Sequence, residues 1–174
     1  YDAQGRLAGV TESHTVTTSW GGGNAALGST ASTSTTNGDP TRAAPKAIDG
    51  FYGDEQLGWL SATADGSGDW LKLDLGSVKE LDRIVYDTRY APAYLTTVYQ
   101  SAFKIWGSED GVNWFSLLEK SGLTSSQLFD VAITPVKVRY VKVLGIQSVW
   151  TAYSTWHYAY VTELGLFEKA GTKT

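Results

Sequence analysis

The chain of 174 residues is long enough for one domain with a full hydrophobic core. Its 42% hydrophobic and 18% charged residues exclude an intrinsically disordered protein. The net charge of -4 and the pI of about 5.1, without any run of like charges, argue against nucleic acid and against an anionic membrane as partners. The absence of Cys excludes disulfides, thiolate zinc sites and a Cys nucleophile.

Aromatic residues are abundant for a chain of this length, with 7 Trp and 10 Tyr. A core does not easily hide so many large rings, so some of them are expected at a surface that contacts a flat ligand. The abundance of Thr, Ser, Gly and Trp is typical of a secreted bacterial module, and we therefore expect an extracellular location.

The chain divides into one domain with two short flanks. Residues 1–23 are expected to be an N-terminal extension or linker, or else an extra edge strand, because Gly21–Gly23 resembles a flexible joint. Residues 24–168 form the predicted domain, and residues 169–174 a C-terminal tail. Within the domain, Ala43–Gly50 favours a single short helical turn, with Pro early and Gly at its end.

The rest of the domain has the pattern of short strands. Apolar and polar residues alternate over 70–75, Gly76-Ser77 interrupts the run, and Ile84–Tyr86 supplies a second strand, which predicts a pair joined by a turn at the centre of an antiparallel sheet. Trp70 falls inside this pattern and Trp114 inside a later one, so both are predicted in the core. Further strands are expected at 102–106, 113–118, 136–144 and 163–167. No longer segment has helical periodicity, and the sequence predicts an all-β sandwich or barrel.

Laid in chain order, these segments resemble the coagulation factor 5/8 type C (discoidin-like) domain, whose bacterial branch is the family 32 carbohydrate-binding modules. The matching segments are Asn24–Gly28, Lys46–Gly50, Trp70–Gly76, Ser108–Trp114, Arg139–Val143 and Thr162–Leu164. The resemblance implies a jelly-roll β-sandwich of about eight main antiparallel strands, of the galactose-binding-domain type. Eukaryotic members usually carry a disulfide, so its absence favours the bacterial, sugar-binding branch.

The resemblance also implies a structural calcium ion that joins a loop to the last strand. Calcium prefers several hard oxygens from carboxylates and from the carbonyls of an irregular loop. Asp49 and Glu163 match ligand positions of the family, and Asp54 is added because this loop is longer than the common pattern. The expected ligands are the side chains of Asp49, Asp54 and Glu163 and the carbonyls of Lys46, Leu57 and Thr162. The alternative is that Asp49 caps a turn and Glu163 meets a surface Lys.

A carbohydrate site is expected where two aromatic loops meet at one end of the sandwich. Sugar rings stack on Trp or Tyr, and their hydroxyls pair with Arg and amide side chains. Arg89 matches the family's sugar-binding Arg. Trp150, Tyr153 and Trp156 lie in a loop predicted over Ile146–Val161, which commonly supplies a stacking aromatic in the family. The expected contacts are Arg89, Tyr90, Tyr99, Trp150, Tyr153, Trp156 and His157. The alternative for any single ring is that it fills a small core of its loop.

The chain differs at two positions from the galactose-binding members of the family, and both differences count against galactose as the ligand. Galactose-binding members commonly carry a His where this chain has Leu60, and an Asn after the Arg, whereas no Asn occurs between Arg89 and Gln100. Another sugar, an acidic sugar paired with Arg89, or a polymer lying across the Trp and Tyr surface stays open.

No catalytic constellation emerges from the sequence. The His residues, His14 and His157, lie far apart, and none of the common hydrolase or phosphate-binding motifs is present. We therefore expect a non-catalytic module that holds a larger secreted enzyme near its glycan or polysaccharide, fused to a catalytic domain of the parent protein. The alternatives are a discoidin-type module for a protein or membrane-surface partner and, less favoured, a small hydrolase or lyase.

Overall fold

The computed structural model describes residues 22–52, 58–62, 65–90, 96–151 and 157–170. In this part of the chain there is no α-helix, and the all-β prediction is confirmed. The strands are β1 (Thr30–Thr33), β2 (Trp59–Leu60), β3 (Leu71–Asp87), β4 (Val98–Ser108), β5 (Phe115–Ser121), β6 (Leu128–Trp150), β7 (Tyr160–Val161) and β8 (Glu163–Glu168). The short 3-10 turns are η1 (Pro40–Arg42) and η2 (Ala44–Ala47); η2 lies within the predicted helical turn at 43–50, and η1 precedes it.

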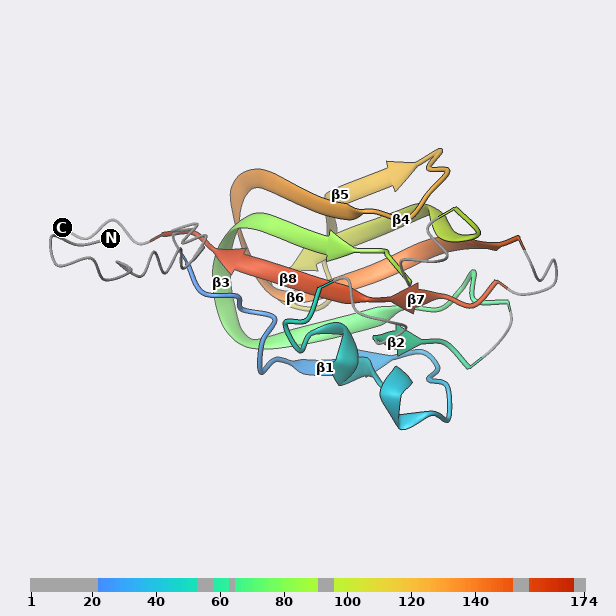
Figure 1. Ribbon diagram of the computed structural model, residues 1–174. Helices are drawn as coiled ribbons and strands as arrows, with labels where there is room; N and C mark the ends of the chain where they lie inside the picture. Colours follow the sequence, from blue (N-terminus) through green and yellow to red (C-terminus); the bar gives the residue numbers. More distant parts are fainter. Residues whose placement is uncertain (1–21, 53–57, 63–64, 91–95, 152–156, 171–174) are drawn as a thin grey trace, which may run out of the picture.

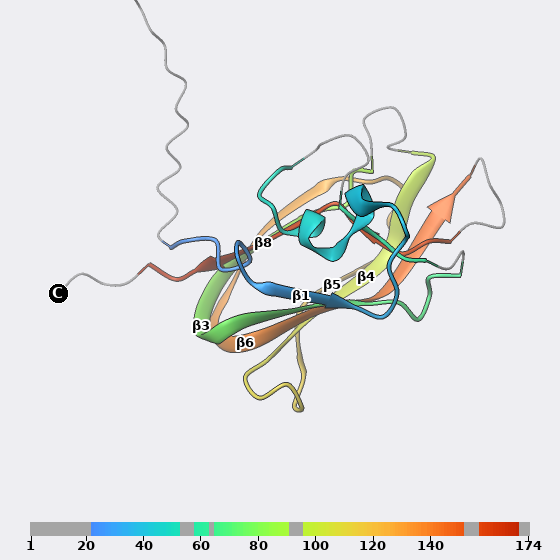
Figure 2. The ribbon, with the colours of Figure 1, turned by 90° about the horizontal axis from the view of Figure 1, so that it is seen from below.

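Two layers arise because the long strands β3 and β6 bend and take part in both (Figure 1). The large layer has the order β1, β3, β6, β4, β5, and uses residues 71–74 of β3 and 140–150 of β6. The small layer consists of residues 79–87 of β3, residues 128–138 of β6, and β8. Figure 2 shows β1, β3 and β6 running side by side in the large layer. Strands β2 and β7 form a separate antiparallel pair.

The predicted turn at Gly76-Ser77 is wrong, because the chain bends there and does not reverse. Residues 71–75 and 84–86 belong to one strand, β3, and each half pairs with β6 instead of with the other half. The pairing register shifts between Asp74 and Lys79, and Gly76 has a φ of 78°. A bulge with a left-handed glycine turns a strand out of its layer without breaking its pairing.

The core lies between the layers. Alternation along the first half of β3 buries Leu71 and Leu73, and the second half of the strand buries Ile84 and Tyr86. Phe103 of the large layer meets Tyr86 of the small layer, with ring centroids 4.6 Å apart. The aromatic contact between layers confirms the sandwich.

The hairpin of β4 and β5 and the closing strand β8 were predicted, and β8 ends within one residue of its expected bounds. Strand β4 extends beyond the predicted 102–106 at both ends, and β5 is shifted along the chain from the predicted 113–118. Strand β6 continues through Trp150, into a stretch predicted to be loop. Trp70 and Trp114 are only half-buried, so their placement in the core is wrong. The ring of Trp70 lies beside the ammonium groups of Lys72 and Lys142, and Trp114 Nε1 donates to the Gly111 carbonyl at 3.2 Å.

Candidate functional site

The loops predicted to bind sugar meet at one end of the sandwich. Strand β3 ends at Asp87, two residues before Arg89, and β6 ends at Trp150. Strand β4 begins at the same end, because Val98 pairs with Trp150. We call this end of the sandwich the loop end (right-hand side of Figure 1). Tyr153 and Trp156 lie outside the described residues.

The loop end contains a small aromatic core of its own. Trp150 and Tyr160 are buried there with Leu60 and Val98, and the half-buried Tyr90 and Tyr158 pack against them. The ring centroid of Trp150 lies 5.0 Å from that of Tyr90 and 6.0 Å from that of Tyr158, in edge-to-face geometry. Because Trp150 is 7% exposed, most of its ring is used for this packing. Its predicted contact with sugar stays a prediction, as do those of the other site residues.

Arg89 is held at the loop end by a buried carboxylate. Its Nε and Nη2 donate to the two oxygens of Asp87 at 2.9 and 2.8 Å, and its backbone N–H donates to the same group. Asp87 is fully buried, whereas the Arg89 side chain is 33% exposed. The hydrogen bonds to Asp87 raise the pKa of Arg89. The guanidinium is thus fixed in orientation while part of it faces solvent.

Asp87 was missed as a site residue, although the sequence carries a signal for it. An acid two positions before an Arg at the end of a strand lies on the same face as that Arg. Arg42 was missed as well, and it donates from η1 to the hydroxyl of Tyr90 at 3.1 Å, with its guanidinium 5.1 Å from the ring centroid. No local pattern links these residues, so only the fold reveals the contact.

A buried chain of hydrogen bonds supports the loop end. The Tyr86 hydroxyl donates to Gln100 Oε1 at 3.0 Å, and Gln100 Nε2 donates to the Tyr160 carbonyl at 2.6 Å. The Tyr160 hydroxyl in turn donates to the Thr88 carbonyl at 3.0 Å. Buried polar groups that all have hydrogen-bond partners keep a region rigid. This network therefore holds the backbone next to Arg89 in place.

The remaining predicted residues surround this core. His157 is exposed, its Nδ1 lies 3.1 Å from the Ser148 carbonyl oxygen, and its backbone forms a parallel bridge with Asp65. Tyr99 is half-buried and paired with Val149. Because side chains alternate along a strand, Tyr99 lies on the opposite face of β4 from the buried Gln100.

The predicted calcium ligands Asp49 and Glu163 also come together. Glu163 is fully buried, and its Oε1 accepts a hydrogen bond from the Gly50 backbone N–H at 3.0 Å. Burial, followed by the nearby charge of Asp49, raises the pKa of Glu163 to about 8. Asp49 Oδ1 accepts from the Phe51 N–H, as in a turn cap, and its Oδ2 lies 3.6 Å from Lys46 Nζ. The turn cap that the alternative predicted at Asp49 is therefore present, whereas no Lys in the described part of the chain pairs with Glu163.

The residues present fit a calcium ion. The second oxygen of Glu163, Oε2, is buried and has no hydrogen-bond partner in the described part of the chain. A buried carboxylate oxygen without a partner, next to a second carboxylate, is costly unless a cation neutralises the pair. Within the described ranges no cluster of three acidic or His side chains is found, so backbone carbonyls would have to complete the shell. Asp54 and Leu57 lie outside the described residues.

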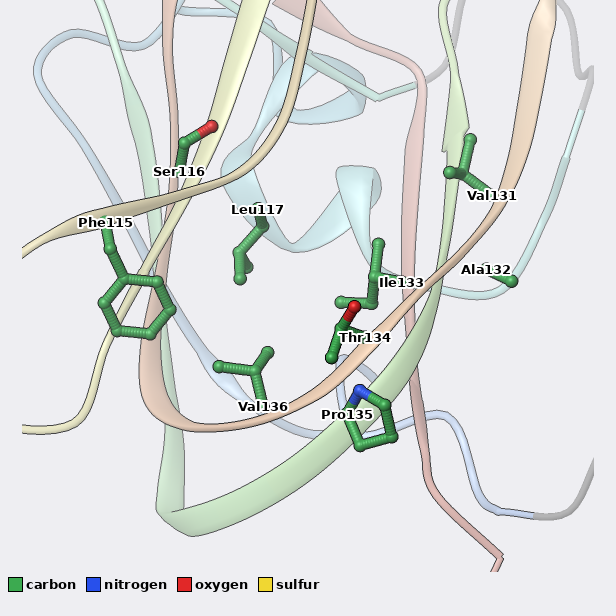
Figure 3. Close-up of a pocket in the computed structure, with 9 residues that line it drawn as sticks. All are labelled: Phe115, Ser116, Leu117, Val131, Ala132, Ile133, Thr134, Pro135 and Val136. Atoms are coloured by element: carbon green, nitrogen blue, oxygen red, sulfur yellow. The ribbon is translucent and has the colours of Figure 1, made fainter.

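A separate hollow of about 460 Å³ lies between β5 and β6, away from the loop end. Figure 3 shows that side chains of both strands, among them Leu117, Ile133 and Val136, gather around the same space. Only Ser116 and Thr134 add hydroxyl groups to its lining, and none of the lining residues is charged. Such a lining gives sugar hydroxyls few partners, so the loop end is the better candidate.

The comparison with known families agrees with this architecture. A model of the F5/8 type C domain matches residues 28–162. The chain belongs to this family. Among curated proteins no sequence matches the chain. In the described part of this family member, no helix is long and apolar enough to cross a membrane.

Solved structures show the same fold in carbohydrate-binding modules. Chitosan-binding module 1 of a chitosanase/glucanase from Paenibacillus sp. IK-5 is 23% identical, with a TM-score of 0.63 over 83% of this chain and 98% of that chain. CpGH89CBM32-5 from Clostridium perfringens, in complex with GalNAc-β-1,3-galactose, is 21% identical, with a TM-score of 0.60 over 82% and 96% of the two chains. The family 89 glycoside hydrolase of that organism matches with a TM-score of 0.64 and 22% identity, over 86% of this chain and 15% of that chain. The predicted family and fold are confirmed.

Proposed function

We propose that the chain is a non-catalytic module that binds a glycan at the loop end. The observation that carries this proposal is the Arg89–Asp87 pair beside the aromatic core. A guanidinium fixed by two hydrogen bonds loses little further freedom when its exposed N–H groups bind hydroxyls or a carboxylate. The half-buried ring of Tyr90 follows it directly in the chain and offers an apolar face for a sugar ring.

The structurally similar modules support the same class of ligand. One bears the name of a chitosan-binding module, and another was solved with a disaccharide. The match to a small part of a glycoside hydrolase supports a role as an attached module. We propose that this chain is likewise part of a larger secreted bacterial enzyme, which it holds near a polysaccharide. A shallow sugar site binds weakly, so a repeated ligand would raise the overall affinity.

The test is a glycan-array and affinity-gel screen of the chain and of an Arg89→Ala variant. We expect one glycan class to be retained by the chain and retention to fall at least about tenfold in the variant. Arg83→Ala is the matched control, because Arg83, which lies on β3, likewise donates two hydrogen bonds to a carboxylate, that of Asp130. Equal losses in both variants, or none, would move the site away from Arg89. A screen without any hit would favour a protein or membrane-surface partner.

We also propose that a calcium ion binds between the loop and the last strand. The carboxylates of Asp49 and Glu163 would hold it, with backbone carbonyls of Lys46 and Thr162 and, from the sequence, Asp54 and Leu57. Its role would be structural, because it would join two segments far apart in the chain and neutralise the buried carboxylate of Glu163.

Chelation tests the calcium proposal. At a calcium concentration of about 100 times Kd, the ion would stabilise the fold by about 2.7 kcal/mol, so EDTA should lower Tm by several degrees. Glu163→Gln is the control, since the amide can still accept from Gly50 but carries no charge. This variant should melt at the same temperature with and without EDTA. An unchanged Tm of the unmodified chain on chelation would overturn the proposal.

A further inference from the structure

A second surface, on the large layer, combines aromatic rings with cationic side chains. Its residues point away from the core, because they alternate with the buried Leu71, Leu73 and Ile105. We call this surface the basic face; it consists of Trp70, Lys72, Lys104, Trp106 and Lys142. None of these residues belongs to the loop site described above.

The basic face brings two lysines together, and no carboxylate in the described residues pairs with either of them. Lys72 of β3 lies directly opposite Lys142 of β6 in the sheet register. Like charges in directly opposite positions destabilise a sheet. In the described residues neither ammonium forms an ion pair, so the repulsion between them is not offset by a carboxylate contact. Burial and the charge of Lys72 lower the pKa of Lys142.

The nearby acids are engaged elsewhere. Asp74 is close enough to Lys72 for that charge to help lower the pKa of Asp74, after its larger hydrogen bonds from Arg139 and Gly76. Both of its oxygens, however, accept from Arg139, at 2.9 and 3.0 Å. Glu119 of β5 accepts a hydrogen bond from Trp106 Nε1 at 2.8 Å. With Arg139 the region contains four cationic side chains and, in Asp74 and Glu119, two acidic ones. It therefore keeps a net positive charge on a protein whose net charge is -4.

Both rings of this face lie beside ammonium groups, since the Lys104 ammonium is 5.9 Å from the Trp106 ring centroid. The Lys142 and Lys72 ammonium groups lie 4.7 and 5.8 Å from the Trp70 ring centroid, within the range of cation–π attraction. Trp70 therefore holds both ammonium groups in one place. Trp106 lies opposite Lys142 on the other side of β6, and its half-buried ring is fixed by Glu119. A hollow of about 450 Å³, lined by residues of β4, β5 and β6 that include Lys104, Glu119 and Lys120, borders the face.

We propose that the basic face binds an anionic polysaccharide, with a carboxylate or sulfate group between Lys72 and Lys142 and a sugar ring on Trp106. An anion placed there would relieve the repulsion between the lysines by accepting charge-assisted hydrogen bonds from both. Strands lie about 4.8 Å apart, so the face from β3 to β4 extends about 10 Å, which suits a short stretch of a linear chain. A nucleic acid is disfavoured, because the acidic protein offers no continuous basic surface to follow its phosphates. The proposal does not depend on the loop site.

The test uses affinity gels with polygalacturonate, dextran sulfate and uncharged dextran, run on the full chain. The chain should be retarded by at least one polyanion, less so at high salt, and not by dextran. The double variant Lys72→Gln/Lys142→Gln should weaken that binding by about tenfold or more, while its Tm stays close to that of the unmodified chain. Polygalacturonate and dextran sulfate distinguish carboxylate from sulfate as the bound group.

The control variant is Lys137→Gln/Lys169→Gln, which changes the net charge equally at exposed lysines outside the basic face. It should bind the polyanions like the unmodified chain. An equal loss in the control double variant would show that the effect depends only on net charge, and would overturn the proposal. So would absence of binding to both polyanions, or tighter binding to single-stranded nucleic acid. Failure of the loop site would show instead in the glycan screen that compares Arg89→Ala with Arg83→Ala.

Discussion

Two regions of this molecule place aromatic rings beside cationic side chains, and they differ in what the rings and the cations contact. At the loop end the rings pack against one another, and Arg89 is paired with the buried Asp87. On the basic face the ring of Trp70 lies beside two ammonium groups, and no carboxylate pairs with either of them in the described ranges. The same residue types therefore have opposite electrostatic settings in the two places.

The two regions therefore act on a ligand in different ways: Arg89 positions it through hydrogen bonds, whereas the lysines attract it through their charge. At the loop end the charge of Arg89 is neutralised by Asp87, so the guanidinium contributes hydrogen-bond geometry to a ligand. Such a site can select a neutral sugar. On the basic face the lysine charges are not neutralised, and a ligand that carries negative charge gains most there. One module could thus hold two chemically different parts of the same polysaccharide matrix.

The largest expected effect tests the difference in packing between the two regions. Trp150→Ala should destabilise the fold by about 4 kcal/mol, because it empties a buried site among Tyr90, Tyr158 and Tyr160. Trp70→Ala should cost only about 1 kcal/mol, since its half-buried ring mainly loses cation–π contacts. Denaturant unfolding of both variants measures the difference. Equal destabilisation would contradict the distinction between a loop core and an open face.

The sequence predicted the elements whose signals are local. The β4–β5 hairpin and β8 show alternation next to turn residues, and both were found, with β8 within one residue of the expected bounds. Gly76-Ser77 gave the wrong answer, because a glycine that reverses a chain and one that bends a strand into the next layer look alike in sequence. Only the pairing of both halves of β3 with β6 distinguishes them.

The residues of the candidate sites, too, were predicted where the signal is local and missed where it depends on the fold. Arg89 was predicted because it directly follows a strand in a recognisable segment, whereas Arg42 reaches Tyr90 from a distant turn. The alternation of Lys72 with leucines places it outside the core, but its position opposite Lys142 depends on the register between β3 and β6. Trp70 was assigned to the core because alternation alone does not tell a half-buried outer ring from a buried one.

The smallest expected effect concerns the charges on the basic face. Burial and, second, the charge of Lys72 place the pKa of Lys142 below the ordinary value of 10.5. The unfolded chain therefore binds this proton more tightly, and the charged form costs stability at every pH below the folded pKa. That cost is lost as the pH rises through the folded pKa towards 10.5.

Lys72→Gln should therefore raise the pKa of Lys142 and stabilise the fold by about 0.3 kcal/mol at neutral pH and low ionic strength. The gain should fade at about 1 M salt, where charges on the surface are screened within about 3 Å. An NMR titration of the lysine side chains measures the pKa, with Lys137→Gln as a variant of equal net charge. If the pKa of Lys142 stays the same or falls in Lys72→Gln, the two ammonium groups do not repel each other, and the basic face loses the unbalanced charge on which its affinity for polyanions depends.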